Sequence, residues 1–239
     1  MHRSAPVKKA YLLAGGRGER LRPLTLGMPK CRVPVAGQPM LALWLDLLAR
    51  HGVTDVLVNV SQHVDQVRAF LSARPAAGPH VTLIHEPEPI GNAGTILANR
   101  TFVDQADDFW ICYSDNVTDA NLTSMGEFHR SHSSIVTMGL FHAPAPEQAG
   151  IVDVDESGVV RGFEEKPLTP KSSLANAGIY LARHALLDAI PPRAGVVDFG
   201  RDVFPSRVGR IHGFVIEEYL LDIGTPSALE RASLEWPAV

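Results

Sequence analysis

Short apolar runs alternate with helix-spaced apolar residues through the first half of the chain. Apolar runs of this length without alternation are typical of strands that are covered on both faces of a sheet. The predicted strands cover residues 9–14, 55–60, 81–86 and 109–114. Apolar residues at helical spacing predict helices around residues 41–48, 64–71 and 94–102. This β-α order predicts a doubly wound α/β fold, in which helices cover both faces of a mostly parallel sheet.

The second half of the chain contains more strands and fewer helices. Asn121 is a predicted N-cap for a helix, and the residues Asp155-Glu156-Ser157-Gly158 between two apolar runs indicate a β-hairpin. Further strands are predicted at residues 135–141, 174–181 and 211–221. A C-terminal helix over residues 225–236 is predicted from Thr225 as N-cap and Pro226 at the first helical position. No linker or repeat divides the chain, so we expect one domain over residues 1–239 with a mixed sheet and two lobes, 7–120 and 121–226.

Charge and composition exclude several classes of protein. The chain of 239 residues carries 22 Lys and Arg against 26 Asp and Glu, a formal net charge of −4. A nucleic-acid binder would usually show a basic stripe, so no nucleic-acid partner is expected. No apolar run approaches the length of a membrane span, and the first residues lack the apolar core of a signal peptide. We therefore expect a cytoplasmic protein with no membrane partner; the sequence leaves homo-oligomerisation open.

The densest group of cations lies in a glycine-rich loop after the first predicted strand. The loop runs from Leu13 to Lys30 and reads LAGGRGERLRPLTLGMPK. Glycine lets a backbone approach a ligand closely and present N–H groups to phosphate. The loop also holds four cations in a chain of negative net charge, namely Arg17, Arg20, Arg22 and Lys30. This combination suits a triphosphate, whereas three glycines alone would equally fit a tight turn with solvated arginines.

Two common phosphate-binding motifs do not fit this loop. A dinucleotide-binding motif needs a third glycine, where this chain has Leu21, and an acidic residue about 20 positions later. Residues 34–44 contain no carboxylate. A P-loop needs Ser or Thr directly after its lysine, but Cys31 follows Lys30. A nicotinamide-dependent oxidoreductase is therefore disfavoured.

Two aspartates follow predicted strands and are candidate metal ligands. Asp115 ends the run from Phe109, and Asp222 ends the run Tyr219-Leu220-Leu221. A single aspartate at such a position is most often a turn former or a helix cap. Two of them at strand ends beside a phosphate-binding loop can share Mg²⁺, which prefers one or two carboxylates together with substrate phosphates and water. The ten histidines show no metal-ligand pattern, and His129 and His132, on one predicted helix, are expected at the surface or partly packed.

These segments, in this order, resemble the motifs of the sugar-phosphate nucleotidyltransferase family. The glycine-rich loop with Arg-Leu-x-Pro-Leu-Thr and Pro-Lys, Ser114-Asp115-Asn116 and residues 221–226 (LDIGTP) resemble its signature and its two metal aspartates. Residues 86–95 (EPEPIGNAGT) are similar to its base-binding segment, and residues 163–167 (FEEKP) and 176–180 (NAGIY) to its sugar-binding segments. The matched segments extend over most of the chain.

The resemblance implies a Rossmann-like nucleotidyltransferase fold, with a nucleotide-binding lobe at 7–120 and a sugar-phosphate-binding lobe at 121–226. It implies catalytic roles on the phosphates for Arg20 and Lys30, and Mg²⁺ binding by Asp115 and Asp222. The residues implied for nucleotide binding are Leu13, Ala14, Gly15, Gly16, Gly18, Glu86, Gly91, Asn92 and Gly94. The residues implied for the sugar phosphate are Gly150, Glu165, Lys166 and Asn176.

The implied reaction joins a nucleoside triphosphate to a sugar 1-phosphate and releases pyrophosphate. The segment around Glu86 and the Glu-Lys-Pro motif resemble mannose- and heptose-1-phosphate guanylyltransferases, which favours GTP. A uridylyltransferase of the same family is the alternative. A second alternative is a regulatory subunit that senses nucleotide sugars. The residues that argue for an enzyme are all present, namely Arg20, Lys30, Asp115, Lys166 and Asp222.

Overall fold

Alternate residues of the central strands face two separate hydrophobic cores. In a computed structural model that describes residues 5–75, 77–192 and 195–236, Ala10 and Leu12 of the first strand face one core and Tyr11 faces the other. Helix α1 packs its apolar stripe, with Trp44, against the first core. Helix α3 contributes Ile96 to the second core. The alternation follows from strand geometry, in which successive side chains point to opposite faces.

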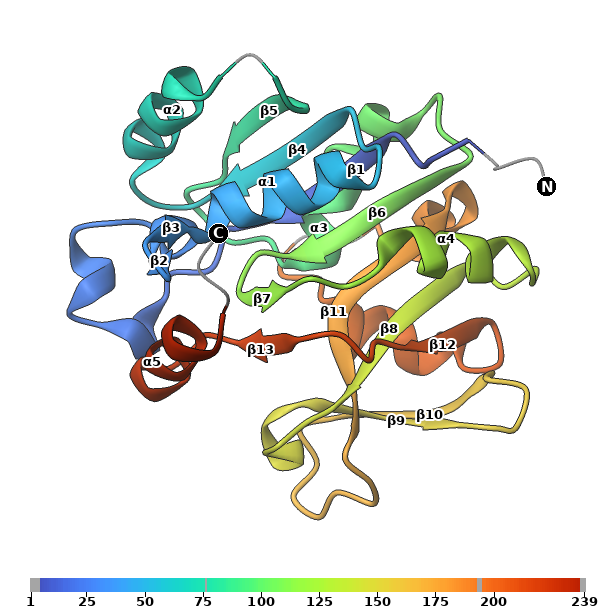
Figure 1. Ribbon diagram of the computed structural model, residues 1–239. Coiled ribbons are helices and arrows are strands. Elements are labelled where there is room, and N and C mark those ends of the chain that lie inside the picture. Colours follow the sequence, from blue (N-terminus) through green and yellow to red (C-terminus); the bar gives the residue numbers. More distant parts are fainter. Residues whose placement is uncertain (1–4, 76, 193–194, 237–239) are drawn as a thin grey trace.

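The described residues form five α-helices and thirteen strands, and nine of these strands belong to one central sheet (Figure 1). The helices are α1 (Met40–Arg50), α2 (Val64–Ala73), α3 (Asn92–Ala98), α4 (Leu122–Arg130) and α5 (Pro226–Glu235). The strands are β1 (Lys9–Leu13), β2 (Pro34–Val35), β3 (Gln38–Pro39), β4 (Asp55–Val60), β5 (His80–His85), β6 (Asp108–Tyr113), β7 (Asn116–Thr118), β8 (Val136–His142), β9 (Gly150–Val154), β10 (Val160–Glu165), β11 (Leu174–Arg183), β12 (Ile211–Val215) and β13 (Leu220–Asp222). Side chains cap two of the helices as predicted: Asn121 accepts from Ser124 N and Thr225 from Ala228 N.

The parallel part of the sheet has the order β6-β1-β4-β5. The chain runs outward from β1 to β5 and then returns to the other side of β1 as β6. The carboxyl ends of β1 and β6 therefore lie side by side at a topological switch point, which is where open α/β sheets bind ligands. Leu13 and Ser114 are held together there, because the Ser114 N–H donates to the Leu13 carbonyl at 3.1 Å. The predicted doubly wound, mixed α/β fold is confirmed.

The antiparallel part extends the sheet beyond β6. Strand β11 pairs antiparallel with both β6 and β8, and β12 pairs parallel with β8. Strands β9 and β10 form the predicted hairpin. In Figure 1 this part lies below the parallel strands. No helix among residues 5–75, 77–192 and 195–236 is long and apolar enough to cross a membrane.

Two predicted elements differ from the structure. The strand predicted over residues 211–221 is two strands, β12 and β13, because the chain leaves the sheet after Val215 and pairs again with β7. The helix predicted over residues 94–102 is α3, which begins at Asn92 and ends at Ala98, followed by a 3-10 turn at Arg100–Val103. The predictions for residues 1–4, 76, 193–194 and 237–239 lie outside the described residues.

Candidate active site

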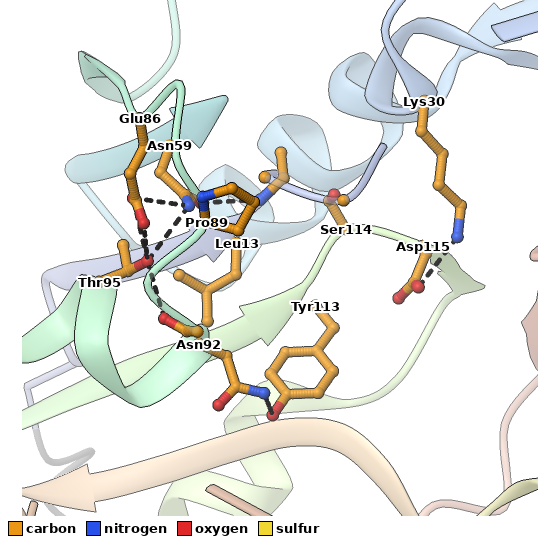
Figure 2. A pocket seen from close by; sticks show the side chains of 14 residues that line it. Leu13, Lys30, Asn59, Glu86, Pro89, Asn92, Thr95, Tyr113, Ser114 and Asp115 are labelled. Atoms are coloured by element: carbon orange, nitrogen blue, oxygen red, sulfur yellow. Dashed lines mark hydrogen bonds and ion pairs between the residues drawn. The ribbon is translucent and has the colours of Figure 1, made fainter. Parts of the chain in front are cut away.

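A cavity of about 240 Å³ lies at the switch point between β1 and β6. It is formed by the glycine-rich loop, the ends of β4 and β6, and the segment that leads into α3 (Figure 2). The lining residues are Leu13, Ala14, Gly15, Gly16, Lys30, Asn59, Glu86, Pro89, Gly91, Asn92, Thr95, Tyr113, Ser114 and Asp115. The backbone of three glycines forms part of the cavity wall, and few of the other lining side chains are bulky. This leaves room for a flat ligand that lies close to the chain.

Asn59, at the end of β4, holds the start of the glycine-rich loop. Its Oδ1 accepts from the Ala14 N–H at 2.9 Å. The neighbouring Ser61 hydroxyl donates to the Gly15 carbonyl at 2.8 Å. A Cβ atom at residue 15 would lie 2.8 Å from Asn59 Nδ2, so a side chain there would displace this anchor. The loop is therefore fixed before any ligand binds.

Glu86 forms a partly buried polar network with Asn59 and Thr95 at one side of the cavity (Figure 2). Asn59 Nδ2 donates to Glu86 Oε2 at 3.0 Å, and the Thr95 hydroxyl donates to Glu86 Oε1 at 2.8 Å. An ionised carboxylate has about four acceptor positions, so two donors leave acceptor capacity for a ligand. Both carboxylate oxygens are thus held in place with free acceptor positions beside the cavity.

The residues before α3 pack against a distant segment of the chain. Gly91 has a left-handed φ of 83°, and a Cβ atom there would collide with the carbonyl oxygen of Val197. The same carbonyl accepts from the N–H groups of Ala93 and Gly94 at 3.0 and 3.1 Å. Glycine at residue 91 is therefore required by the close approach of the two backbones.

Asp115 and Asp222 lie close together because β7 and β13 pair directly beside them. Asp222 pairs with Asn116, and the Ile223 N–H donates to the Asp115 carbonyl at 2.9 Å. Burial, and then the charge of Asp115, raises the pKa of Asp222, while the charges of Lys30 and Arg20 lower it. Lys30 Nζ lies 3.0 Å from Asp115 Oδ2, and only 11% of its side chain is exposed.

Arg20, from the glycine-rich loop, lies close to Asp222. A Cβ atom at residue 224 would overlap the Arg20 guanidinium, so Gly224 makes room for this cation beside Asp222. The Gly224 N–H also donates to Asp222 Oδ1 at 2.6 Å, which fixes the carboxylate. Two cations of the glycine-rich loop and two carboxylates from two other segments thus lie close together beside the cavity.

The carboxylate pair fits a hard divalent cation whose coordination shell is completed by a bound ligand. Among the described residues, no group of three or more His, Cys, Asp or Glu side chains is arranged to hold a metal ion. Mg²⁺ usually takes one or two carboxylates and completes its shell with phosphate oxygens and water. Two facing carboxylates whose repulsion raises the pKa of one of them match this donor set.

A larger groove of about 900 Å³ adjoins the cavity on the antiparallel side of the sheet. It shares Asn92, Tyr113 and Asp115 with the cavity. Its lining residues are Arg20, Asn92, Tyr113, Asp115, Asn116, Phe141, Glu147, Gln148, Ala149, Gly150, Glu165, Lys166, Asn176, Ala177, Gly178, Asp198, Gly200, Arg201 and Asp222. Its polar walls and cations suit a phosphorylated, hydroxyl-rich ligand.

Lys166 has a backbone conformation that a non-glycine residue seldom adopts. Its φ is 49°, and its N–H donates to the Ala149 carbonyl at 3.0 Å. A left-handed conformation costs a non-glycine residue about 1–2 kcal/mol. Glu165 beside it lies between two glycines, because a Cβ atom at Gly150 or Gly200 would come within 2.9 or 2.7 Å of Glu165 Oε2. Strain of this kind persists where it positions functional groups.

Comparison with known proteins agrees with this geometry. The family model of nucleotidyl transferases matches residues 9–238. The chain belongs to the nucleotidyl transferase family. It is 32% identical over 223 residues to mannose-1-phosphate guanyltransferase beta-A of Xenopus laevis, with 91% of this chain and 61% of the relative covered. It is 34% identical over 230 residues to mannose-1-phosphate guanylyltransferase of Mycobacterium tuberculosis, with coverage of 95% and 64%.

A solved structure gives the same fold. A Bacillus anthracis protein described as a glucose-1-phosphate thymidylyltransferase superimposes with a TM-score of 0.84 at 25% identity, over 95% of this chain and 94% of that one. The chain spans less than two thirds of the length of the two guanylyltransferases above. The predicted membership of this family is thus confirmed over nearly the whole chain, and the predicted fold with it.

Most site residues predicted from the resemblance to nucleotidyl transferases lie together in the structure. The cavity collects Lys30, Asp115 and the predicted nucleotide-binding residues other than Gly18 and Gly94. The groove collects Arg20, Asp222 and the four residues predicted for the sugar phosphate. Gly18 instead shapes the loop, with a φ of 63° and its carbonyl bonded to the Thr25 hydroxyl. Gly94 lies in the first turn of α3, where its N–H is bonded to Val197.

Sequence reasoning missed several residues of the site in this nucleotidyl transferase. Asn59 could have been found, because an asparagine inside the apolar run DVLVNV needs a buried partner. Tyr113 and Thr95 carry no comparable signal in their segments. Asp198 and Arg201 lie in a π-helical turn at Phe199–Val203 and its cap, a segment without clear periodicity. Their approach to the groove depends on long-range packing.

Proposed function

We propose that this protein is a sugar-1-phosphate nucleotidyltransferase, which transfers a nucleoside monophosphate from a triphosphate to a hexose or heptose 1-phosphate. The observation that carries the proposal is the junction of two ligand-sized hollows at Asp115, with Lys30, Arg20 and Asp222 around it. The names of the two guanylyltransferase relatives support it, although this chain spans only 61% and 64% of their lengths.

The chemistry needs alignment and charge neutralisation more than a base. An oxygen of the sugar phosphate attacks the α-phosphorus, a new P–O bond forms, the bond to the β-phosphate oxygen breaks, and pyrophosphate leaves. A phosphate monoester already carries about 1.5 to 2 negative charges at pH 7, so no side chain has to remove a proton. Holding two polyanions in line can contribute about 7 to 11 kcal/mol through effective molarity.

The cations of the site divide between the two substrates. Lys30 lines the cavity and Arg20 the groove, so both can offset the charge that develops on the transferring and leaving phosphates. Lys166 lines the groove with 65% of its side chain exposed, and we propose that it holds the sugar phosphate. Glu165 beside it provides acceptors for sugar hydroxyls.

Mg²⁺ is the metal that we propose for Asp115 and Asp222. The family generally uses a divalent metal. When bound, Mg²⁺ would screen the phosphate charges and polarise the phosphoryl oxygens. The two carboxylates would form the protein's part of its shell, and the Gly224 N–H holds the Asp222 carboxylate in one orientation.

Guanine is the base that fits the Glu86 network. Its Watson–Crick edge presents two adjacent donors, N1–H and N2–H, to the two oxygens of a carboxylate. Uracil presents one donor between two carbonyl oxygens, which a carboxylate would repel. Asn59 and Thr95 hold the Glu86 carboxylate by hydrogen bonds, and its remaining acceptor positions are left for the base. GTP is therefore the proposed nucleotide.

The proposal is tested by pyrophosphate release with Mg²⁺, using five nucleoside triphosphates crossed with a panel of hexose and heptose 1-phosphates that includes mannose 1-phosphate. Release with GTP and one sugar phosphate is expected. Release with UTP instead would support the proposed reaction class but overturn the choice of base. Nucleotide binding without turnover on any sugar phosphate would favour a regulatory subunit, and absence of nucleotide binding would overturn the proposal.

Base recognition is tested separately with Glu86→Gln. The amide replaces one acceptor by a donor, so kcat/KM for GTP should fall by about 10- to 100-fold, as expected for loss of a bidentate contact of about 1–3 kcal/mol. The value for UTP should stay level or rise. Glu88→Gln is the matched control, because Glu88 lies exposed in the same loop. Equal losses for both nucleotides would show that Glu86 holds the loop and does not read the base.

A further inference from the structure

One turn in the wall of the groove carries an acidic and a basic side chain to which the proposed reaction gives no role. Asp198 is the cap of the π-helical turn at Phe199–Val203, and Arg201 lies within that turn. Both residues line the groove, with 33% of the Asp198 side chain and 60% of the Arg201 side chain exposed. The turn therefore presents a carboxylate and a guanidinium together to a ligand in the groove.

The backbone of this turn is fixed by contacts with α3 and within the turn itself. The Phe199 N–H donates to Asn92 Oδ1 at 2.7 Å, and the Phe199 side chain is fully buried. The Asp198 N–H donates to Asp202 Oδ2 at 2.8 Å, and the Asp202 N–H donates to the Asp198 carbonyl at 2.8 Å. The side chains of Asp198 and Arg201 therefore extend from a backbone that is in place before a ligand binds.

The guanidinium of Arg201 is held through Nη2 and Nε. Nη2 lies 3.2 Å from Asp202 Oδ2 and 3.2 Å from Asp198 Oδ2, and Nε lies 3.4 Å from Asp202 Oδ1. The Val196 carbonyl oxygen lies 3.5 Å from the same Nη2. Nη1 has no partner among the residues that the structure describes, so its two N–H groups are left for a ligand in the groove that Arg201 lines.

The carboxylate of Asp198 also keeps acceptor capacity. Its Oδ1 accepts a long hydrogen bond of 3.4 Å from the Asn92 N–H at the start of α3, and its Oδ2 faces Arg201. An ionised carboxylate has about four acceptor positions, so about two of them remain. Asp198 and Arg201 thus offer acceptors and donors within one ion pair.

The charges around the turn favour a hydroxyl group over a phosphate. Carboxylates at 3.2 Å offset the charge of the Arg201 guanidinium, and the Asp198 carboxylate repels an anion. Lys166 is paired more loosely, at 4.0 Å from Glu165, and attracts a phosphate better. A hydroxyl group can both donate to a carboxylate and accept from a guanidinium. The turn also lies against Glu165, because a Cβ atom at Gly200 would come within 2.7 Å of Glu165 Oε2.

We propose that Asp198 and Arg201 determine which sugar the groove accepts, by binding its hydroxyl groups. Asp198 accepts from a sugar hydroxyl, and Nη1 of Arg201 donates to a hydroxyl oxygen. The inference rests on the proposed function and deepens it, because it names the part of the sugar 1-phosphate that the turn reads. A site that hydrogen-bonds a hydroxyl group disfavours the analogue that lacks it, since the polar groups of the protein are then left unpaired.

The test changes the protein and the substrate together. kcat/KM is measured with the nucleotide and the sugar 1-phosphate that the panel above selects, and then with forms of that sugar phosphate that each lack one hydroxyl group. In the unaltered protein, removal of a contacted hydroxyl should lower kcat/KM by about 10- to 100-fold, as expected for a hydrogen bond to a charged group. A change in the protein and a missing hydroxyl that remove the same contact give losses that do not add.

Two variants remove the two groups in turn. Arg201→Gln removes the guanidinium, and Asp198→Asn removes the carboxylate but keeps an Oδ1 acceptor for the Asn92 N–H. Each should lower kcat/KM for the complete substrate by about 10- to 100-fold, and by less than about threefold for one deoxygenated form. Arg161→Gln is the matched control, because Arg161 is 57% exposed and pairs with Asp155 at 2.7 Å but lines neither hollow. It should leave kcat/KM unchanged for every substrate.

The outcomes separate this inference from the function on which it rests. Losses that disappear with one deoxygenated form in both variants, together with unchanged kinetics of Arg161→Gln, would support it. Equal losses with every form in either variant would overturn it, because a turn that only shapes the groove behaves in that way. Unchanged kcat/KM in either variant would overturn it as well and would leave the proposed function standing. Absence of turnover by the unaltered protein with every sugar phosphate would overturn the proposed function and this inference with it.

Discussion

The molecule contains two clusters of ionisable side chains that differ in how their charges are satisfied. The carboxylate cluster (Lys30, Asp115 and Asp222) places two like charges side by side at the mouth of a cavity. The histidine cluster (His129, His132 and His212) lies on α4, after its end, and on β12. Here the His132 and His212 rings stack with their centroids 4.0 Å apart, His129 packs edge-on against His132, and the rings bond to neighbouring hydroxyl groups.

The polar atoms of the histidine cluster bond mostly to neighbouring hydroxyl and backbone groups, whereas the buried His129 Nε2 has no hydrogen-bond partner among the described residues. The Ser134 N–H donates to His132 Nδ1 at 3.2 Å, so the opposite nitrogen carries the hydrogen and donates to the Thr137 hydroxyl at 3.0 Å. Thr137 can then donate to His129 Nδ1 at 2.7 Å. The chain of donors ends with His129 Nε2, 3.5 Å from Asp108. This arrangement stabilises a fold but offers nothing to a ligand.

The comparison teaches where to look for function. Charges that are paired and closed off serve stability, whereas facing carboxylates beside an open hollow are retained at a cost in free energy that a ligand can relieve. Changes in the carboxylate cluster should therefore remove activity without unfolding the protein. Changes in the histidine cluster should do the opposite.

The largest effect is expected for Asp222→Asn. The amide keeps an acceptor for the Gly224 N–H but loses the charge that would bind Mg²⁺. We expect turnover to fall by at least about 10²–10³-fold, as for loss of one group that stabilises the transition state. The midpoint of thermal unfolding should stay level or rise, because the repulsion from Asp115 disappears.

Pyrophosphate release and thermal unfolding check this prediction together. Asp119→Asn is the control, since Asp119 is exposed just beyond β7. A clear fall in the midpoint for Asp222→Asn would place Asp222 among the structural charges. A near-normal rate would remove it from the site.

A smaller difference is expected between two cations of the glycine-rich loop. Lys30→Ala should lose about 100-fold in kcat, because Lys30 lines the cavity beside Asp115. Arg22→Ala should change kcat by less than about threefold, since Arg22 is half exposed and pairs with Glu19 at 3.7 Å on the surface. The measurement is steady-state kinetics of both variants. Equal losses would show that the catalytic cation has been chosen wrongly.

The two clusters also show what a sequence can predict. The residues of the carboxylate cluster follow apolar strands or a glycine-rich loop, so their place at a strand end could be predicted. The nearness of Asp115 to Asp222 depends on the pairing of β7 with β13. This pairing was not predicted, since Asn116–Thr118 is short and residues 211–221 were predicted as a single strand. The motif resemblance supplied what local pattern could not.

The histidine cluster had no such signal. His129 and His132 were expected at the surface or partly packed, yet His129 is fully buried. Its burial depends on Thr137 and Asp108 from two different strands, and their positions follow from the sheet topology. The segment around Asp198 and Arg201 was missed for the same reason. Local periodicity predicts elements, whereas contacts between distant elements require the fold.

The smallest effect is expected from pH, and it concerns the histidine cluster. Burial, followed by the charges of His212, His129 and Arg183, lowers the pKa of His132 to about 4 from the usual 6.5. Between these values the unfolded chain binds more protons than the folded protein, so the free energy of unfolding decreases as pH falls from about 6.5 to about 4. Because His132 is partly open to solvent, the decrease should be about 2 kcal/mol rather than the full value of the shift.

His132→Asn tests this prediction, because its Oδ1 can accept from the Ser134 N–H in place of Nδ1 but does not titrate. Denaturant unfolding at pH 4.5, 5.5 and 7 should show a weaker pH dependence in this variant than in the unaltered protein. His85→Asn, an exposed position at the end of β5, should keep the full dependence. If the free energy of unfolding of His132→Asn depends on pH as strongly as that of the unaltered protein, the acid sensitivity arises elsewhere. A folded protein that keeps the His132 ring neutral must lose stability in the pH range where the unfolded chain takes up that proton.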